Sequence, residues 1–157
     1  MDGKRVVHEH TQTNDGAPER VFPLLCPVRE AEWVSGWKYR LVYSQSGVAE
    51  LGCVFTTPNE DGSETTWMCV AYEPPRRISY VWLWPGMIAT RLDIELTPAG
   101  DKTNAHIRYA YTALSEQGAR EVQRYDAAWF ESKMTSWEKA INHYLRTGKK
   151  LEAAAWE

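Results

Sequence analysis

The chain has 157 residues, of which 43% are apolar and 25% are charged, with 18 Lys and Arg against 21 Asp and Glu. This length and composition predict one globular domain with a core large enough to be stable without disulfides or metals. The net charge is −3, and no basic run is longer than Arg76-Arg77 or Lys149-Lys150. These features argue against a nucleic-acid-binding protein.

The cysteines and histidines do not suggest a metal site or a cofactor. Cys26, Cys53 and Cys69 are odd in number and lack metal-ligand spacing, which favours a reducing compartment and buried thiols. His8 and His10 would share a strand face but are two ligands short of a structural zinc site, so we expect exposed histidines. The N-terminal sequence has no apolar leader and no stretch reaches membrane-spanning length, so we expect a cytoplasmic protein.

The first elements are a strand and two short helices. Residues 4–13 alternate weakly and predict a strand, which the turn residues 14–16 end. Pro18 suits the first turn of a short helix. A second short helix is expected over 28–34, where Ser35-Gly36 ends it.

Six further strands are predicted, separated by short turns rich in Pro, Gly and Asn. Because parallel neighbours need long crossover connections, these turns indicate an antiparallel sheet. The strands are expected over residues 39–45, 48–57, 65–72, 77–84, 88–96 and 105–113.

The last element is predicted to be one long helix. Residues 119–146 contain no Pro or Gly, Ser115 is a suitable N-cap, and Gly148 stands at the usual glycine position after a helix. We therefore expect a single domain over residues 1–148 and a tail over 149–157.

This order of elements resembles the START-like (SRPBCC) superfamily, also called birch-pollen-allergen-like or polyketide-cyclase-like. The local likeness is carried by "APERVFPLL", "YEPPRRISYVW", "LDIELTPAGDKTNAHIRYAY" and "WFESKMTSWEKAINHYL". The resemblance implies an α+β helix-grip fold, in which a curved antiparallel seven-strand sheet (β-α-α-β6-α) surrounds the long C-terminal helix and leaves a cavity. Members of the superfamily bind lipids, hormones or polyketides, and others are cyclases, hydrolases or chaperone-binding proteins.

Side-chain alternation predicts which strand residues face this cavity. A period of two places Thr90 and its even-numbered neighbours inward on 88–96, and Tyr109 and Tyr111 inward on 105–113. Both faces of 77–84 are fairly apolar, and we favour the Tyr80, Trp82 and Trp84 face as inward. These rows could equally be ordinary core.

Asp126 and Lys133 interrupt the apolar face predicted for the long helix. A charge in a buried stripe is costly unless it is paired or wet. One interpretation is that both side chains contact a ligand in a wet cavity. The alternative is local: the Lys133 stem lies on Trp129 and Trp137, and Asp126 pairs with a sheet arginine or lies near the exposed helix start.

Three functions follow as hypotheses. The first is binding of a small apolar or aromatic molecule, lipid- or polyketide-like, in the internal cavity. The second is an aromatase/cyclase-type or hydrolase-type enzyme that uses Asp126 and a cavity tyrosine as acid and base. The third is a chaperone- or partner-binding module that uses exposed Trp84 or Trp156. Trp33 would line the cavity mouth or anchor the core. The ligand-binding residues predicted are Trp33, Tyr80, Trp82, Thr90, Tyr109, Tyr111, Asp126, Trp129, Lys133 and Trp137.

Overall fold

The computed structural model describes residues 4–152. It contains the seven strands predicted and, besides the short helical segments, two C-terminal helices. The strands are β1 (Arg5–Asn14), β2 (Arg40–Tyr43), β3 (Val54–Pro58), β4 (Glu64–Glu73), β5 (Arg77–Trp84), β6 (Ile88–Ala99) and β7 (Lys102–Ala113). The helices are α1 (Pro18–Val21), the 3₁₀ turn η1 (Phe22–Leu24), α2 (Pro27–Glu30), α3 (Glu116–Gln123) and α4 (Ala127–Thr147).

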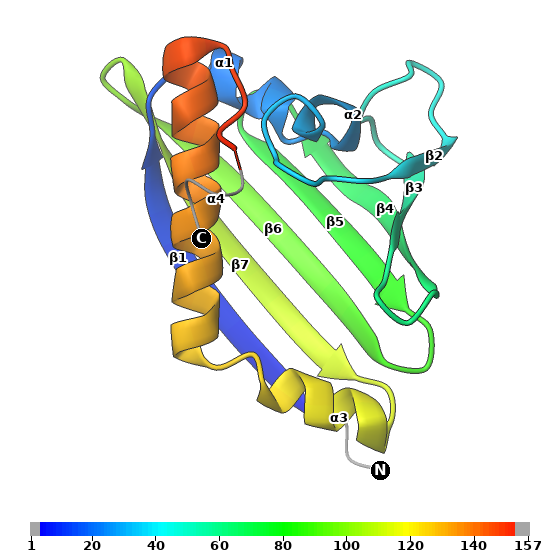
Figure 1. Cartoon of the computed structure of the whole chain (residues 1–157). Helices are drawn as coiled ribbons and strands as arrows, with labels where there is room; N and C mark the ends of the chain where they lie inside the picture. Colours follow the sequence, from blue (N-terminus) through cyan, green and yellow to red (C-terminus); the bar gives the residue numbers. More distant parts are fainter. Residues whose placement is uncertain (1–3, 153–157) are drawn as a thin grey trace.

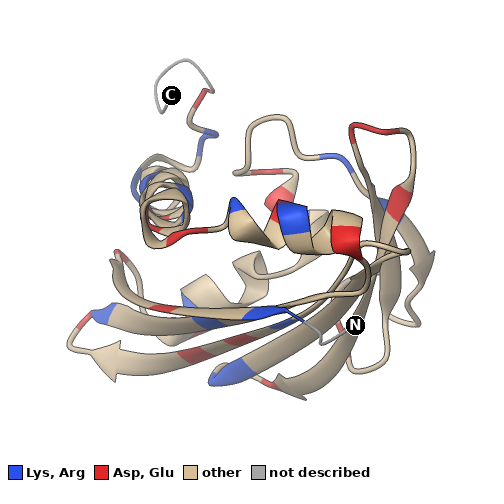
Figure 2. Ribbon diagram, turned by 90° about the horizontal axis from the view of Figure 1, so that it is seen from below, with Lys and Arg blue, Asp and Glu red and all other residues tan. Residues whose placement is uncertain are grey.

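The strands form one antiparallel sheet in the order β1-β7-β6-β5-β4-β3-β2. Every neighbour except the β1–β7 pair is also consecutive in sequence, as short turns require. The helices lie on one face of the curved sheet, and α4 runs along the β1–β7 side (Figures 1 and 2). This is the α+β helix-grip arrangement predicted. Lys and Arg occur on the same elements as Asp and Glu (Figure 2).

The strand predicted over 48–57 is shorter than expected. Residues 44–53 form a loop, and the strand begins only at Val54. The Glu50 carboxylate holds this loop because it accepts hydrogen bonds from the backbone N–H groups of Gln45 at 2.8 Å and Ser46 at 2.7 Å. A side chain has thus replaced the sheet as the partner of these backbone groups, which sequence alternation does not reveal.

The long C-terminal helix that the sequence predicts is present as α4, but the expected continuity of a single helix over residues 119–146 is wrong. The helix breaks at residues 124–126, and Asp126 is an exposed N-cap whose carboxylate accepts a hydrogen bond from the Trp129 N–H at 2.8 Å. Ser115 caps α3 in the same way through the Gly118 N–H at 3.0 Å. Asp is among the preferred N-cap residues, so the break is stabilised without Pro or Gly.

Two adjacent faces of helix α4 contact the rest of the protein. One face packs into the core through Phe130, Met134, Ile141 and Leu145, all buried. The face beside it carries Trp129, Lys133 and Trp137 toward the sheet. The apolar face expected from a continuous helix over 119–146 comprised Val122, Tyr125, Trp129, Ser136, Trp137, Ala140, Ile141 and Tyr144, and so left out Phe130 and Met134.

The inner face of β1 supports α4 with polar side chains. His8 is half-buried rather than exposed: its Nε2 lies 2.6 Å from the Tyr125 carbonyl oxygen, and its ring stacks on Phe130 at 4.8 Å. His10 is also half-buried, which corrects the expectation of exposed histidines. Asn142 of α4 donates to the Thr13 carbonyl at 3.0 Å and so fixes the helix to the end of β1.

Residues 4–152 contain no candidate membrane span and no candidate metal site. None of the helices there combines the length and apolar character that a membrane crossing needs. No three His, Cys, Asp or Glu side chains in the same part of the chain converge to hold a metal ion. Cys26, Cys53 and Cys69 are free thiols and are buried, as the sequence predicted.

Candidate ligand-binding cavity

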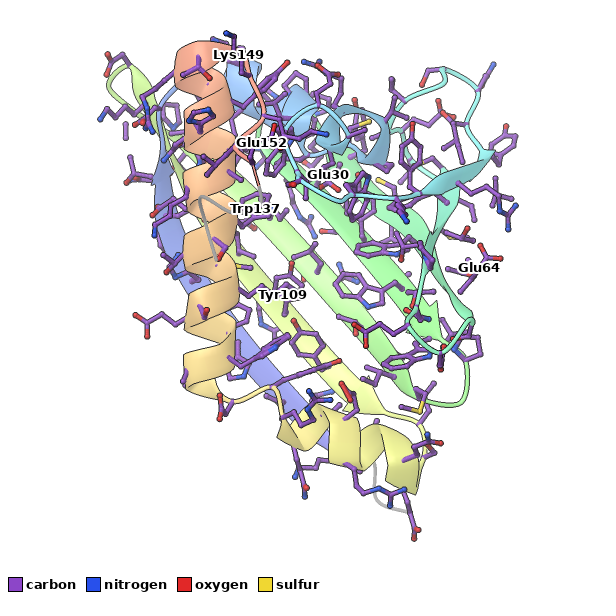
Figure 3. The ribbon with its side chains drawn as sticks, in the orientation of Figure 1. Glu30, Glu64, Tyr109, Trp137, Lys149 and Glu152 are labelled. Atoms are coloured by element: carbon purple, nitrogen blue, oxygen red, sulfur yellow. The ribbon has the colours of Figure 1, made fainter. Side chains whose placement is uncertain are left out.

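A cavity of about 360 Å³ lies between the concave face of the sheet and α4. Its volume is within the range of small-molecule sites, which begins at about 300 Å³. Figure 3 shows Glu30, Tyr109 and Trp137 pointing into this space from α2, β7 and α4. Strands β3 to β7 supply one wall, and α2 with the segment after it covers one end. The sheet therefore does not close fully on the helix.

The alternating aromatic residues of β5 face this cavity. Tyr80, Trp82 and Trp84 all line it, whereas Leu83 on the opposite face is 45% exposed. Trp82 lies 4.0 Å from the Trp67 ring on β4, measured between ring centres. The orientation that the sequence left open is settled: the aromatic face of this strand points inward.

Three aromatic residues of the cavity wall donate their polar hydrogens to other groups of the protein. Tyr80 OH donates to the Leu25 carbonyl at 2.8 Å, and Trp37 Nε1 donates to the Pro27 carbonyl at 2.9 Å. Trp67 Nε1 donates to Thr57 Oγ1 at 2.9 Å. Since their donors are used, these rings are fixed in orientation and offer apolar surface to the cavity.

Lys133 brings an amine into the aromatic wall. Its Nζ lies 4.7 Å from the centre of the Tyr109 ring and 5.2 Å from that of Trp129. Among residues 4–152 no carboxylate pairs with it, and desolvation lowers its pKa to about 8. Much of the side chain is nonetheless accessible, because it borders the open cavity. The ammonium is thus held by ring faces and not by an ion pair.

Glu30 lies at the end of the cavity under α2. Its carboxyl has no side-chain partner in the described part of the chain, and desolvation raises its pKa to about 8. The side chain is only half-buried by surface area, since it too faces the cavity. Burial also raises the pKa of Tyr109 and of Tyr80, with a smaller contribution from the charge of Glu30. At neutral pH the favoured form of Glu30 is the protonated acid.

Two hydroxyl groups of the wall stand out because they have no partner among residues 4–152. Thr90 Oγ1 on β6 and Tyr111 OH on β7 are buried and have no hydrogen-bond partner within residues 4–152. Both residues line the cavity, and they are opposite each other in the β6–β7 register.

The structure brings together eight of the ten residues predicted to contact a ligand. Lining the cavity are Tyr80, Trp82, Thr90, Tyr109, Tyr111, Trp129, Lys133 and Trp137.

Trp33 and Asp126 do not line the cavity, which corrects both predictions. Trp33 is fully buried, its Nε1 donates to the Leu24 carbonyl at 3.0 Å, and its ring contacts Trp137 edge-on at 5.3 Å. Asp126 is exposed and occupied as a helix cap, so the acid of the predicted Asp126–tyrosine pair is absent from the cavity. Trp84, proposed as an exposed contact, lines the cavity, and Trp156 lies outside the described residues.

Sequence reasoning missed Glu30 and Trp67 among the lining residues. Alternation could have found Trp67, because Thr65 and Trp67 on β4 face inward while Thr66 and Met68 are exposed. Nothing in the sequence around Glu30 distinguishes it from Glu32, which is exposed.

The fold has counterparts among solved structures. Norcoclaurine synthase from Thalictrum flavum superposes with a TM-score of 0.67 at 11% identity, over 92% of this chain and 88% of the synthase. Mll3558 from Rhizobium loti gives 0.63 at 20% identity, over 91% and 99% of the two chains. DynU16, a protein of the dynemicin biosynthetic locus, gives 0.61 at 18% identity over 91% of this chain, which spans only 48% of DynU16.

No protein-family model and no curated protein sequence matches the chain. The structural likeness, at these low identities, shows a shared fold. The chain therefore shares the helix-grip fold of these structures, as its sequence predicted.

Proposed function

We propose that the protein binds a small, largely apolar or aromatic molecule in the cavity between the sheet and α4. The observation that carries this proposal is the 360 Å³ space walled largely by aromatic rings, of which Tyr80, Trp37 and Trp67 already use their polar hydrogens within the protein. A dry apolar cavity of about 150 Å³ is enough to hold benzene, so a guest of two fused rings is a reasonable size here. Displacing water from such walls is favourable by roughly 25 cal/mol per Å² of apolar surface.

The structural neighbours support a guest of this kind. One crystal structure of norcoclaurine synthase, with a TM-score of 0.65, contains dopamine and hydroxybenzaldehyde, which are small aromatic molecules. Its identity to this chain is only 11%, so it supports the size and character of the guest and not the chemistry. The catalytic alternative loses its proposed acid, because Asp126 caps α4 outside the cavity.

The direct test is a titration with naphthalene and related ring compounds, in which tryptophan fluorescence reports binding. Six of the lining residues are tryptophans, namely Trp37, Trp67, Trp82, Trp84, Trp129 and Trp137, so a guest must contact the reporter groups. We expect a saturable change at one site per chain. Native mass spectrometry of freshly purified protein would show whether a guest is carried along.

A blocking variant makes the test specific to the cavity. Val34 is half-buried and lines the space, so Val34→Phe would fill part of it and weaken binding about tenfold or more. Val7→Phe is the matched control, because Val7 is 42% exposed on the other face of β1. Equal affinities in both variants, or no saturable signal in the folded wild type, would refute the proposal.

A further inference from the structure

The unpartnered hydroxyl groups of Thr90 and Tyr111 point to the polar part of the guest. Their residues are 4% and 3% exposed, and neither hydroxyl has a partner among residues 4–152. A buried hydroxyl left without a hydrogen bond costs free energy, so native proteins rarely keep one without a reason. Here two stand at directly paired positions of β6 and β7, in the wall of one cavity. Both hydroxyls therefore belong to adjacent strands of one part of the wall and are free to hydrogen-bond to a guest there.

The surroundings of this site are aromatic. The Tyr111 ring stacks on Tyr109 at 5.4 Å, contacts Tyr125 at 4.9 Å and meets Trp129 edge-on at 6.1 Å, measured between ring centres. The rest of a guest that reaches these hydroxyls therefore meets ring faces and edges. Aromatic guests gain from such contacts beyond simple burial.

The charge near the site favours an oxygen over an amine. Lys133 Nζ lies over Tyr109 and Trp129, the same two rings that contact Tyr111. A second cation brought here would be repelled, whereas an oxygen with partial or full negative charge would be attracted. Hydroxyl donors together with a positive charge match a hydrogen-bond acceptor.

We propose that the guest is an aromatic compound with an oxygen-bearing substituent, and that the hydroxyls of Thr90 and Tyr111 bind this substituent. The inference rests on the proposed function, since it assigns the chemical class of the guest in the same cavity. The aromatic body lies against Tyr109, Tyr125 and Trp129, and Lys133 favours an acidic oxygen such as that of a phenol or a carboxylate.

Matched probes and isosteric variants test the site. Dissociation constants are measured for naphthalene, 2-naphthol and 2-naphthoate with wild type, Thr90→Val, Tyr111→Phe and the double variant. Tyr111→Phe removes the hydroxyl and Thr90→Val replaces it with a methyl group of similar size. Neither hydroxyl has a partner to lose within the described residues, so the variants should melt no lower than wild type. Thr112→Val is the control, because Thr112 faces the other side of β7 and its hydroxyl oxygen accepts from Arg5 Nε at 2.8 Å.

We expect each single variant to weaken binding of 2-naphthol or 2-naphthoate about three- to tenfold, with naphthalene unchanged. The probe with the larger loss shows whether the phenol or the carboxylate is preferred. If the oxygenated probes lose no more affinity than naphthalene, the site assignment is overturned while cavity binding stands. If no probe binds the folded wild type, the proposed function itself fails.

Discussion

Lys133 Nζ lies 4.7 Å from the centre of the Tyr109 ring, without a carboxylate partner in the described part of the chain. The contact joins the one lysine in the cavity wall to a tyrosine of the opposing sheet. Because the ring face is only weakly attractive compared with a carboxylate, the ammonium keeps most of its capacity to attract an anion.

Binding of 2-naphthoate should weaken as the pH rises through about 8. Desolvation lowers the pKa of Lys133 to about 8, so the ammonium is charged below this pH and neutral above it. We expect an approximately tenfold loss of affinity across the transition, since a hydrogen bond to a charged group is worth roughly 1.5–3 kcal/mol. In Lys133→Met the affinity should be lower and should fall less steeply with pH; the remaining dependence, which the ionisation of Glu30 near the same pH supplies, should disappear in the double variant Lys133→Met/Glu30→Gln. A wild-type curve that stays flat would contradict the role of Lys133.

Glu30→Gln should stabilise the protein at neutral and mildly alkaline pH. The pKa of Glu30 is raised from its ordinary value to about 8 by desolvation, so the unfolded chain releases this proton at lower pH than the folded protein does. The stabilisation that the protonated acid allows is present at low pH and is lost between about 4.5 and 8.

Thermal melts at pH 5 and pH 8 check this sign for Glu30. Glutamine copies the neutral acid, so the variant should unfold with about 1 kcal/mol more free energy than wild type at the higher pH, a value reduced by the wetness of the cavity. At pH 5 the variant and the wild type should have nearly the same free energy of unfolding. Glu95→Gln, on the exposed face of β6, is the control, and it should not gain stability over wild type between pH 5 and pH 8.

Gly118→Ala should destabilise the protein by about 1 kcal/mol. A Cβ on Gly118 would overlap the backbone carbonyl of Met87, so α3 can approach the β5–β6 turn only with glycine at this position. The helix propensity of alanine favours the variant by about 1 kcal/mol, but overpacking against a backbone atom costs about 1–3 kcal/mol and forces α3 away. Chemical unfolding measures the difference. The control Ala119→Gly has no such overlap and should lose the helix propensity and the packing of one half-buried methyl group. An equal or more stable Gly118→Ala would show that the contact is not tight.

Trp33→Phe should lower stability and leave ligand affinity unchanged. The variant loses the hydrogen bond to the Leu24 carbonyl and part of a fully buried side chain, at a cost of about 2–3 kcal/mol. Trp33 does not line the cavity, so naphthalene binding below the melting temperature should match that of wild type. A large change in affinity with little change in stability would show that Trp33 contacts the ligand.

Much of the fold could be predicted because local patterns and tertiary burial agree. On β6 the alternation of Ile88, Thr90 and Leu92 with Arg91 and Asp93 is clean, and the structure buries the predicted face. On β5 both faces are apolar, so only the curvature of the sheet decides that Tyr80 and Trp82 face the cavity.

The features that sequence reasoning missed depend on tertiary position. The break before α4 contains neither Pro nor Gly, and an Asp within a helical periodicity does not by itself identify a cap. Glu30 is a cavity acid only because α2 covers the end of the sheet, a placement that no local pattern records. The sequence therefore allowed us to predict the part of the cavity wall that the strands form. It did not reveal the end of the cavity that the short helices cover.

The separate capping of α3 and α4 has a geometric consequence. Ser115 and Asp126 each start their own helix, and residues 124–126 connect the two. Each helix can therefore begin in its own direction, and α4 is not constrained to continue the axis of α3. Tyr125 lies between the two helices and lines the cavity, so the Tyr111 end of the cavity is bounded by a connecting segment and not by a continuous helix.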